Sequence, residues 1–361
     1  MLLKEFDYAL PAELIAQRPL AERDASRLMV LDRAAQRFED RSFREIPQIL
    51  QAGDLLVFNN TKVFPARLLG HRRGLTAQKL GKNNPAGREF LTGETELMLT
   101  RQEGADIWQG LVHPGRKVRT GEILVFGDDE LEAEVLDRGE YGVRRVRLRA
   151  RQGTIEECLD RLGHVPLPPY IRRSDEPGDR TTYQTIYAKV RGAVAAPTAG
   201  FHFTERIFAA LRARGVETCE ITLHVGLGTF QPVRTERVED HRMEAERYQV
   251  SEAAAAAINR ALDAHRRVIA VGTTSVRTLE HVAREHGGRI LPGAGETSLF
   301  ITPGFDFQVV QGVLTNFHLP QSTLLMLVSA FAGKDFVRRA YQHAVETRYR
   351  FYSYGDCMLI V

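Results

Sequence analysis

The sequence has few cysteines, and their positions exclude the sites that cysteine usually builds. Cys158, Cys219 and Cys357 are odd in number and far apart, and the 361 residues contain no C-x-x-C pair. This pattern argues against a disulfide framework and against a zinc ribbon, and it is typical of a reducing compartment.

Long apolar runs and an excess of one charge are also missing. Apolar runs such as 324–328 are far shorter than the ~18 residues that a membrane-spanning helix needs. Lys4, Glu5 and Asp7 interrupt the first apolar residues, so we expect no secretory signal and a cytoplasmic protein. Lysine and arginine number 49 against 46 acidic residues, so any nucleic-acid partner has to bind a local patch.

The chain is long enough for two domains, and its pattern changes along its length. Glycines separate short apolar segments between residues 96 and 149, which predicts a small all-β barrel or sandwich. From Thr154 onwards, strands alternate with helices as in an α/β domain. We predict a discontinuous α/β domain of residues 1–67 plus 152–361, with residues 68–151 inserted as the all-β domain.

Four local expectations refine this outline. Segment 75–92 reads as a long hairpin tip, 298–301 as a strand, and a helix is expected to begin at Val276 after a polar turn. The charged segment 237–248 reads as a loop.

A run of small residues, 192–200, precedes Phe201, His202 and Phe203. Alanine and glycine let a ligand approach closely, so this run and its Thr198 suit the floor of a pocket, although tight backbone packing explains it as well. His202 lies between two rings, and an imidazole that titrates near neutrality suits general acid or base catalysis. A structural histidine in a packed core is the alternative.

Further polar segments follow predicted strands, where loops often carry chemistry. Segment 59–67 places amides, Lys62 and Arg67 after an apolar strand, although an Asn-rich turn explains it equally well. Segment 272–275 offers N–H groups and the hydroxyls of Thr273 and Thr274 to a phosphate or carboxylate. The other candidates stand in segments 222–233 and 315–323: His224, Gly226, Gly228, Thr229, Phe230, Asn316, Phe317 and His318.

Four histidines thus fall on separate predicted strand-end loops: His202, His224, His241 and His318. The H-E-x-x-H and C-x-x-C contexts of zinc sites are missing, so we expect no metal. The spacings of a P-loop and of a dinucleotide fingerprint are missing too. Aromatic neighbours of these histidines suit a purine or a sulfonium, although core packing accounts for some of them: Phe201, Phe203, Phe230 and Phe317.

One row of arginines stands out in the all-β segment. Side chains of a strand alternate between faces, so every second residue from 145 to 151 projects to one side. A phosphate backbone fits such a row, and a solvated barrel face is the alternative. The row consists of Arg145, Arg147, Arg149 and Arg151.

Several long motifs together resemble the S-adenosylmethionine:tRNA ribosyltransferase-isomerase family of queuosine synthesis, in the order of that family and over nearly the whole chain. They lie at 14–17, 60–63, 65–68, 164–171, 183–188, 192–200 with 202–204, 222–226 with 228–230, 315–320 with 322–328, and 349–351 with 355–356. Among them are HVPLPPYI, YQTIYA, GAVAAPTAG and TNFHLP.

The resemblance implies a fold and a reaction. Members of this family move the ribosyl part of S-adenosylmethionine onto 7-aminomethyl-7-deazaguanine at the wobble position of a tRNA, and rearrange it to epoxyqueuosine. Adenine and methionine leave, so the sulfonium compound is consumed as donor and no recycled cofactor is expected. The implied fold is a larger mixed α/β, barrel-like domain with an inserted small β-barrel, in a monomeric cytoplasmic enzyme.

This chemistry gives the candidate residues roles. The sulfonium acidifies the protons on the adjacent ribose carbon, so a base removes one, and adenine needs a proton donor as it leaves. Our hypothesis is that His202 or His224 is the base, and that His318 or Glu246 assists adenine departure.

Two positions depart from the family pattern, and two other functions stay open. Glu244 stands where members commonly have a second histidine, and Ser298 stands where an aspartate is frequent. Glutamate cannot substitute for imidazole without a change of charge, so we take the Glu244 position as peripheral, as a tRNA or loop contact. A tRNA-binding protein without turnover and a purine nucleosidase are the alternatives.

Overall fold

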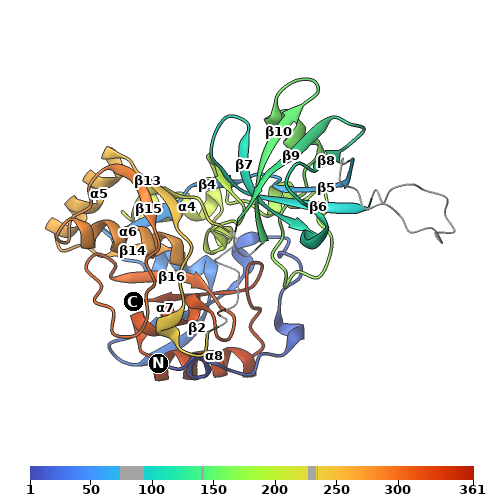
Figure 1. Cartoon of the computed structure of the whole chain (residues 1–361). Helices are drawn as coiled ribbons and strands as arrows, with labels where there is room; N and C mark the ends of the chain where they lie inside the picture. Colours follow the sequence, from blue (N-terminus) through green and yellow to red (C-terminus); the bar gives the residue numbers. More distant parts are fainter. Residues whose placement is uncertain (74–92, 140–141, 227–232, 234) are drawn as a thin grey trace.

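The computed structural model describes residues 1–73, 93–139, 142–226, 233 and 235–361. The chain forms a larger α/β body that contains both termini and a smaller all-β body beside it (Figure 1). The hairpin tip expected at 75–92 lies outside the described residues.

A nine-stranded mixed sheet is the frame of the larger body. Its strands are β1 (Arg27–Asp32), β2 (Arg37–Ser42), β3 (Leu55–Asn59), β12 (Glu217–Leu223), β13 (Glu246–Val250), β14 (Val268–Val271), β15 (Gly293–Thr297), β16 (Gly312–Asn316) and β17 (Cys357–Ile360). The order is β15-β13-β12-β3-β14-β16-β17-β1-β2. The four neighbours β12, β3, β14 and β16 run parallel, so their carboxyl ends meet at one edge of the sheet.

The central strands are buried on both faces, as their continuous apolar sequences require. In β3, Leu55 and Val57 enter one core while Leu56 and Phe58 enter the other, which is the two-residue period of a strand. The first core takes residues from α5 (Glu252–Asp263), α6 (Thr273–Glu285), α7 (Thr323–Ala332) and α8 (Lys334–Glu346). The second core takes residues from α1 (Ile46–Ile49) and α4 (Glu205–Ala213).

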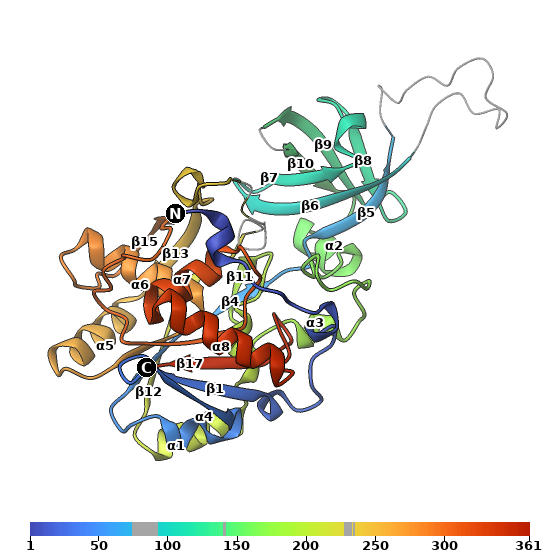
Figure 2. The same cartoon turned by 90° about the horizontal axis from the view of Figure 1, so that it is seen from below.

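The smaller body is a closed barrel in the order β10-β7-β6-β5-β8-β9. Its strands are β5 (Arg67–Arg72), β6 (Glu94–Gln102), β7 (Ile107–His113), β8 (Ile123–Phe126), β9 (Leu131–Arg138) and β10 (Val143–Ala150). Helix α2 (Ile155–Leu162) adds Cys158 and Leu159 to the barrel core, and Thr154 caps it in a capping box with Glu157. The barrel stands away from the large sheet when the molecule is seen from below (Figure 2).

These observations confirm the predicted fold class, a mixed α/β domain with an inserted β-barrel. Besides short 3-10 helices, the structure also contains α3 (Asp179–Thr182) and the short parallel pair β4 (Thr61–Val63) and β11 (Val190–Ala193). The limits 67/68 and 151/152 between the domains stay a prediction. Among the helices of the described residues, none has both the length and the apolar character needed to cross a membrane.

Three local predictions need correction. Segment 298–301 is not a strand. The strand of this region is β15, which ends at Thr297 and pairs with β13. Strand β13 itself falls partly in the segment read as a charged loop, and its ladder comes from its two neighbours rather than from an apolar pattern. Helix α6 begins at Thr273 and not at Val276, because Gly272 in the left-handed region (φ 88°) ends β14 and starts the helix at once.

Candidate functional site

The polar residues of the site follow the carboxyl ends of the four parallel strands. His224 follows β12, Thr61 lies two residues beyond β3, Thr273 follows β14 after one residue, and His318 follows β16 after one. Ligands of open α/β sheets bind beyond the carboxyl ends of parallel strands, because the loops there converge while the strands stay rigid. The topology therefore brings segments that are far apart in sequence to one place.

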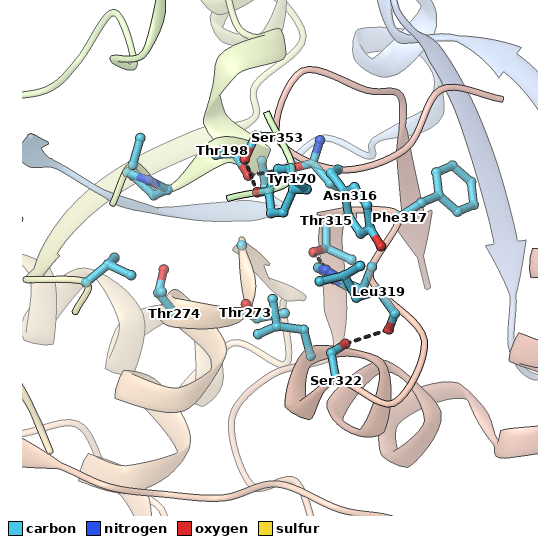
Figure 3. Close-up of a pocket in the computed structure, with 18 of the residues that line it drawn as sticks. Tyr170, Thr198, Thr273, Thr274, Thr315, Asn316, Phe317, Leu319, Ser322 and Ser353 are labelled. Atoms are coloured by element: carbon cyan, nitrogen blue, oxygen red, sulfur yellow. Dashed lines mark hydrogen bonds between the residues drawn. The ribbon is translucent and has the colours of Figure 1, made fainter. Parts of the chain in front are cut away.

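A cavity opens at these strand ends (Figure 3). Thr198, Tyr170 and Asn316 lie on one side of it, and Thr273, Thr274 and Ser322 lie on the other (Figure 3). The small residues 196–199 form part of its wall, as expected for the run of alanines and glycines. The full lining adds Val225, Gly272, Thr315, Phe317, His318, Leu319, Pro320, Leu324, Tyr352 and Ser353.

Two helices begin at this cavity. Helix α7 is capped by Ser322, whose hydroxyl accepts from the Leu325 N–H at 3.2 Å. Helix α6 has Gly272 at its N-cap and no side-chain cap, and Thr273 is 6% exposed. Helix N-termini carry partial positive charge and unpaired N–H groups. The α6 end of the cavity is therefore suited to a carboxylate or a phosphate, as the sequence predicted for Thr273 and Thr274.

His318 lies in the cavity wall and is neutral. Burial lowers the pKa of its imidazole to about 3. Nε2 contacts the Thr315 hydroxyl at 2.9 Å, and the backbone N–H donates to the Tyr341 hydroxyl at 3.0 Å. These contacts hold a neutral ring against the cavity.

His202 lies behind the wall of the cavity rather than in it. Its Nδ1 contacts the Ser26 hydroxyl at 2.7 Å and its Nε2 contacts Asn316 Nδ2 at 3.2 Å, so both ring nitrogens are engaged. Burial, reinforced by the positive charges of Arg23 and Arg350, lowers its pKa to about 3. The cavity meets Asn316 and not His202.

A crevice separates the barrel from the α/β domain near the same edge of the sheet. Two adjoining hollows make up this interdomain crevice, and both are lined by Arg101, Gly192, His224 and Arg247. Arg101 comes from β6 of the barrel, and Arg247 from β13 of the large sheet. The Arg247 guanidinium donates to the Gln102 carbonyl at 3.4 Å, and Arg101 pairs with Glu296 at 2.6 Å, so both arginines bridge the domains.

His224 is the half-buried histidine of the crevice. Its Nδ1 contacts the Thr61 hydroxyl at 2.8 Å, and within the described residues its Nε2 makes no hydrogen bond. Any side chain at Gly192 would meet the ring at 2.7 Å, so the glycine makes room for the imidazole. Burial, and to a smaller extent Arg247, lowers the pKa of His224.

Glu246 is a buried carboxylate at the edge of the crevice. It forms an ion pair with the buried Arg277 of α6 and accepts from the Gly226 N–H at 2.9 Å. It therefore holds the segment just after His224. Glu244 lies on the surface of the same crevice, Ser298 is exposed, and His241 packs edge-on against Phe300 elsewhere.

The predicted aromatic lining is mostly core. Phe203 is fully buried against Phe43 and Phe58, and Phe317 lines the cavity with its backbone while its ring points away (Figure 3). Phe201 stacks on Tyr354 at 6.0 Å, in a separate small hollow behind the cavity. Phe230, Gly228 and Thr229 lie outside the described residues.

The rings that do line the cavity are Tyr170 and Tyr352, which sequence reasoning missed. They stack at 4.6 Å between centroids, and the Tyr170 hydroxyl contacts the Ser353 hydroxyl at 2.6 Å. Tyr170 belongs to the proline-rich motif and Tyr352 directly follows segment 349–351 of the C-terminal motif, so the two motifs themselves were the available signal.

The arginine row of β10 is interleaved with carboxylates. Arg145 pairs with Glu103 at 2.7 Å, and Arg147 and Arg149 both contact Glu134 within 3.6 Å. Such exposed pairs neutralise much of the local charge, although each stabilises the fold little. Of the other predicted tRNA contacts, Lys62 is exposed and Arg67 pairs with Glu96 at 2.9 Å; Arg151 is 3.9 Å from Asp129.

Within the part of the chain that the structure describes, histidine, cysteine, aspartate and glutamate form no group fit to hold a metal ion. The cavity instead offers hydroxyls, amides, two aromatic rings and a helix N-terminus, which is a donor set for an organic ligand.

Comparisons with known proteins cover the whole chain. The sequence model of the family described as "Queuosine biosynthesis protein" matches residues 3–360. The S-adenosylmethionine:tRNA ribosyltransferase-isomerase of Solibacter usitatus is 55% identical over the full length of both chains, and that of Desulfitobacterium hafniense is 49% identical, also over both full lengths. The crystal structure of the S-adenosylmethionine tRNA ribosyltransferase of Thermotoga maritima is 40% identical, with a TM-score of 0.53, over 99% of this chain and all of that one.

Proposed function

The chain belongs to the queuosine-biosynthesis family of S-adenosylmethionine:tRNA ribosyltransferase-isomerases, and from this premise we propose how its cavity and crevice share the reaction. The protein transfers the ribosyl group of S-adenosylmethionine to 7-aminomethyl-7-deazaguanine at the wobble position of a tRNA and isomerises it. The products are epoxyqueuosine-tRNA, adenine and methionine. S-adenosylmethionine is a consumed substrate in this reaction.

The observation that carries the proposal is a shared wall. Val225 lines the cavity, while its neighbour His224 lines the interdomain crevice. Ala196 lines the cavity and Gly192, four residues earlier, lines the crevice. We assign the cavity to S-adenosylmethionine and the crevice to the tRNA, so that donor and acceptor meet at His224.

The cavity offers a partner to each part of the donor. The Tyr170–Tyr352 pair presents aromatic surface for adenine and for the sulfonium. The uncapped start of α6 presents N–H groups and the Thr273 hydroxyl for the methionyl carboxylate. Holding both ends of the donor fixes the ribose between them, where proximity lowers the barrier to transfer.

His224 is the base that we assign. The sequence offered His202 and His224 as the base, and His224 is the half-buried one of the two. Its lowered pKa keeps it neutral at pH 7. The sulfonium acidifies the protons on the adjacent ribose carbon, and the imidazole lone pair takes one of them. Both nitrogens of His202 are already engaged, so we assign it no proton transfer.

Two further groups support the departure of adenine and the approach of the tRNA. His318 faces the cavity as a neutral imidazole and offers a hydrogen bond to the leaving purine. Glu246 keeps the segment after His224 in place through Gly226. Arg101, Arg191 and Arg247 offer positive charge to the tRNA backbone at the crevice. The predicted row at 145–151, Lys62 and Arg67 stay further tRNA-contact candidates.

The proposal is tested by measuring adenine release from S-adenosylmethionine with purified protein. We expect release only when the tRNA carries 7-aminomethyl-7-deazaguanine, with one methionine formed for each adenine. Release without tRNA would favour a purine nucleosidase. Binding of tRNA with no release at all would favour a binding protein without turnover.

A further inference from the structure

We infer that His202 is a positioning residue that helps to hold the hydrogen-bond polarity of the cavity wall at Thr198, because it accepts the second hydrogen of the Asn316 side-chain amide. The inference rests on the proposed function, because it concerns how the cavity selects its ligand. It assigns to the Thr198 oxygen the part of an acceptor for a donor group of the substrate.

Two acceptors hold the Asn316 amide, and one of them, a backbone carbonyl, shows which way the amide faces. The Asp356 carbonyl lies 3.3 Å from Asn316 Nδ2, and a carbonyl can only accept a hydrogen bond. The amide nitrogen therefore faces Asp356, and the amide oxygen faces the other way. Asp356 is itself fixed, since its carboxylate accepts from the backbone N–H groups of Arg27 and Arg350 at 2.9 and 2.8 Å.

The tautomer of His202 follows from the orientation of Asn316. The second hydrogen of Asn316 Nδ2 points to His202 Nε2 at 3.2 Å, so Nε2 carries the lone pair. The ring hydrogen is then on Nδ1 and is donated to the Ser26 oxygen at 2.7 Å. Ser26 in turn donates to the Arg23 carbonyl at 3.4 Å, which ends the chain. Each polar hydrogen in this chain of hydrogen bonds therefore has one acceptor.

The polarity of Thr198 follows from the other end of the amide. Asn316 Oδ1 is an acceptor only, and the Thr198 hydroxyl lies 3.0 Å from it. The Thr198 hydrogen is therefore committed to Asn316, and Thr198 presents lone pairs to the cavity. If the amide were reversed, Asn316 would donate to Thr198, and the Thr198 hydroxyl would be free to donate to a ligand.

This arrangement selects a donor group on the ligand. S-adenosylmethionine carries ribose hydroxyls, an exocyclic amine and an ammonium, each of which donates hydrogen bonds. An acceptor fixed in a buried wall favours such a group and disfavours a ligand with an acceptor at that place, because two facing lone pairs leave both without a partner.

The experiment compares His202→Gln with His202→Phe. Glutamine offers an oxygen that accepts from Asn316, whereas phenylalanine keeps the ring and removes the acceptor. Steady-state kinetics of adenine release with modified tRNA are measured for both, for Thr198→Val, and for the double variant His202→Phe/Thr198→Val. We expect His202→Phe and Thr198→Val each to raise the KM for S-adenosylmethionine about tenfold, the effect of one lost hydrogen bond, with a smaller change in kcat.

The double variant should match Thr198→Val alone, because His202 acts through Thr198. His202→Gln should stay close to the wild type. The inference would be overturned if His202→Gln lost as much kcat as His202→Phe and if the rise of the rate with pH at acidic pH disappeared. That result would show that His202 is a general base. Full additivity of the two single variants would overturn the inference as well.

A spectroscopic readout keeps the inference testable if His202→Phe does not fold. Nitrogen NMR of wild-type protein with labelled histidine distinguishes the two neutral tautomers. We expect His202 as the Nδ1–H form, unchanged between pH 5 and 9, and Ser26→Ala should alter its Nδ1 signal. An Nε2–H tautomer would overturn the inference. This readout needs no substrate, so failure of the proposed reaction and failure of the hydrogen-bond chain are told apart.

Discussion

We assign different tasks to three buried or half-buried histidines near one edge of the sheet because their surroundings differ. His224 keeps one nitrogen free toward the interdomain crevice, His318 faces the cavity, and His202 is closed in by Ser26 and Asn316. Histidine alone therefore does not identify a base. The free lone pair does, since proton transfer requires hydrogen-bond reach to the substrate.

The first prediction concerns the pH dependence of the reaction. Burial lowers the pKa of His224 below 6.5, the ordinary value for histidine. The imidazole that we assign as the base therefore stays mostly unprotonated at pH 6.5. We expect kcat/KM to rise with pH to a plateau, with a midpoint below 6.5. His224→Gln should lower kcat at least about 100-fold, the usual size of a general-base contribution, and remove this limb.

The matched control for that experiment is His286→Gln, which changes an exposed histidine at the end of α6. Its pH profile should coincide with that of the wild type. If His224→Gln retained the wild-type rate and profile, another group would be the base.

The second prediction concerns stability in mild acid. His202 and His318 have pKa values of about 3 in the folded protein, while unfolded histidine titrates near 6.5. Below pH 6.5 the unfolded chain binds protons that the folded chain does not, so stability falls as the pH falls. From pH 7.5 to 5.0 each histidine should cost about 2 kcal/mol of unfolding free energy.

Urea unfolding of wild type and His202→Gln at both pH values measures this cost. The loss of stability between pH 7.5 and 5.0 should be smaller in the variant by about 2 kcal/mol, since one of the two histidines no longer titrates. Equal losses in both proteins would show that His202 is accessible to protons in the folded state.

For single residues, the sequence predicted which polar residues line the cavity better than it predicted which way the neighbouring aromatic rings point. Thr198, Thr273, Thr274, Asn316 and His318 all line the cavity, because each follows a strand end or small-residue run that the pattern made visible. The aromatic predictions were weaker. Phe203 follows the 3-10 turn 198–202 and Phe317 follows β16, and both rings are buried in the core instead.

At the scale of elements, the start of α6 is the feature with the most direct functional consequence. Its first turn follows Gly272 without a side-chain cap, and it faces the cavity with Thr273 and Thr274. A ligand carboxylate there would take the place of the missing cap.

The third prediction follows from that arrangement. Thr273→Val should raise the KM for S-adenosylmethionine about tenfold, as expected for loss of a hydrogen bond to a charged group. Decarboxylated S-adenosylmethionine lacks the carboxylate, so its KM should be the same in wild type and variant. The measurement is steady-state kinetics of adenine release with both compounds.

Ser251→Ala is the matched control, because Ser251 caps α5 away from the cavity and accepts from the Ala254 N–H at 3.2 Å. It should lower stability by about 1 kcal/mol without changing the KM. If Thr273→Val raised the KM of both sulfonium compounds equally, the carboxylate assignment would be wrong.

Elements with continuous apolar sequences could be predicted from the sequence. Strands that depend on hydrogen bonds to neighbouring strands, without an apolar pattern of their own, could not. β3 and β14 consist almost wholly of buried apolar residues, and α4 and α5 begin directly after their N-caps, Thr204 and Ser251. β15, with the sequence GAGET, carries no such signal. Its ladder with β13 forms only once the sheet is in place.

For the whole molecule, the arginines fall into two sets by their place, on the barrel face or at the interdomain crevice. The row on β10 meets acidic partners of the barrel. Arg101, Arg191 and Arg247 surround the crevice together with His224, and of these Arg101 and Arg191 also form ion pairs, with Glu296 and Asp160, both at 2.6 Å. Residues far apart in sequence form this crevice, which is why the sequence pointed to the row instead.

The fourth prediction separates the two sets. The double variant Arg191→Glu/Arg247→Glu should weaken tRNA binding at least about tenfold and lower the salt dependence of the binding constant, since phosphate contacts are lost. Arg147→Glu/Arg149→Glu should have a smaller effect, because these two arginines do not line the crevice to which we assign the tRNA. Filter binding at several salt concentrations measures both. A larger effect at the row would move the tRNA site to the barrel face.

The most direct test of the account is to follow the ribosyl group itself. The protein is incubated with S-adenosylmethionine labelled with carbon-13 in the ribose, together with tRNA that carries 7-aminomethyl-7-deazaguanine. The tRNA is then digested, and the masses of its nucleosides are measured by mass spectrometry. The account predicts a heavier wobble nucleoside that holds all the labelled ribosyl carbons, with adenine and methionine released unlabelled, and no such product with unmodified tRNA. A labelled sugar set free in solution, with the wobble nucleoside unchanged, would contradict it.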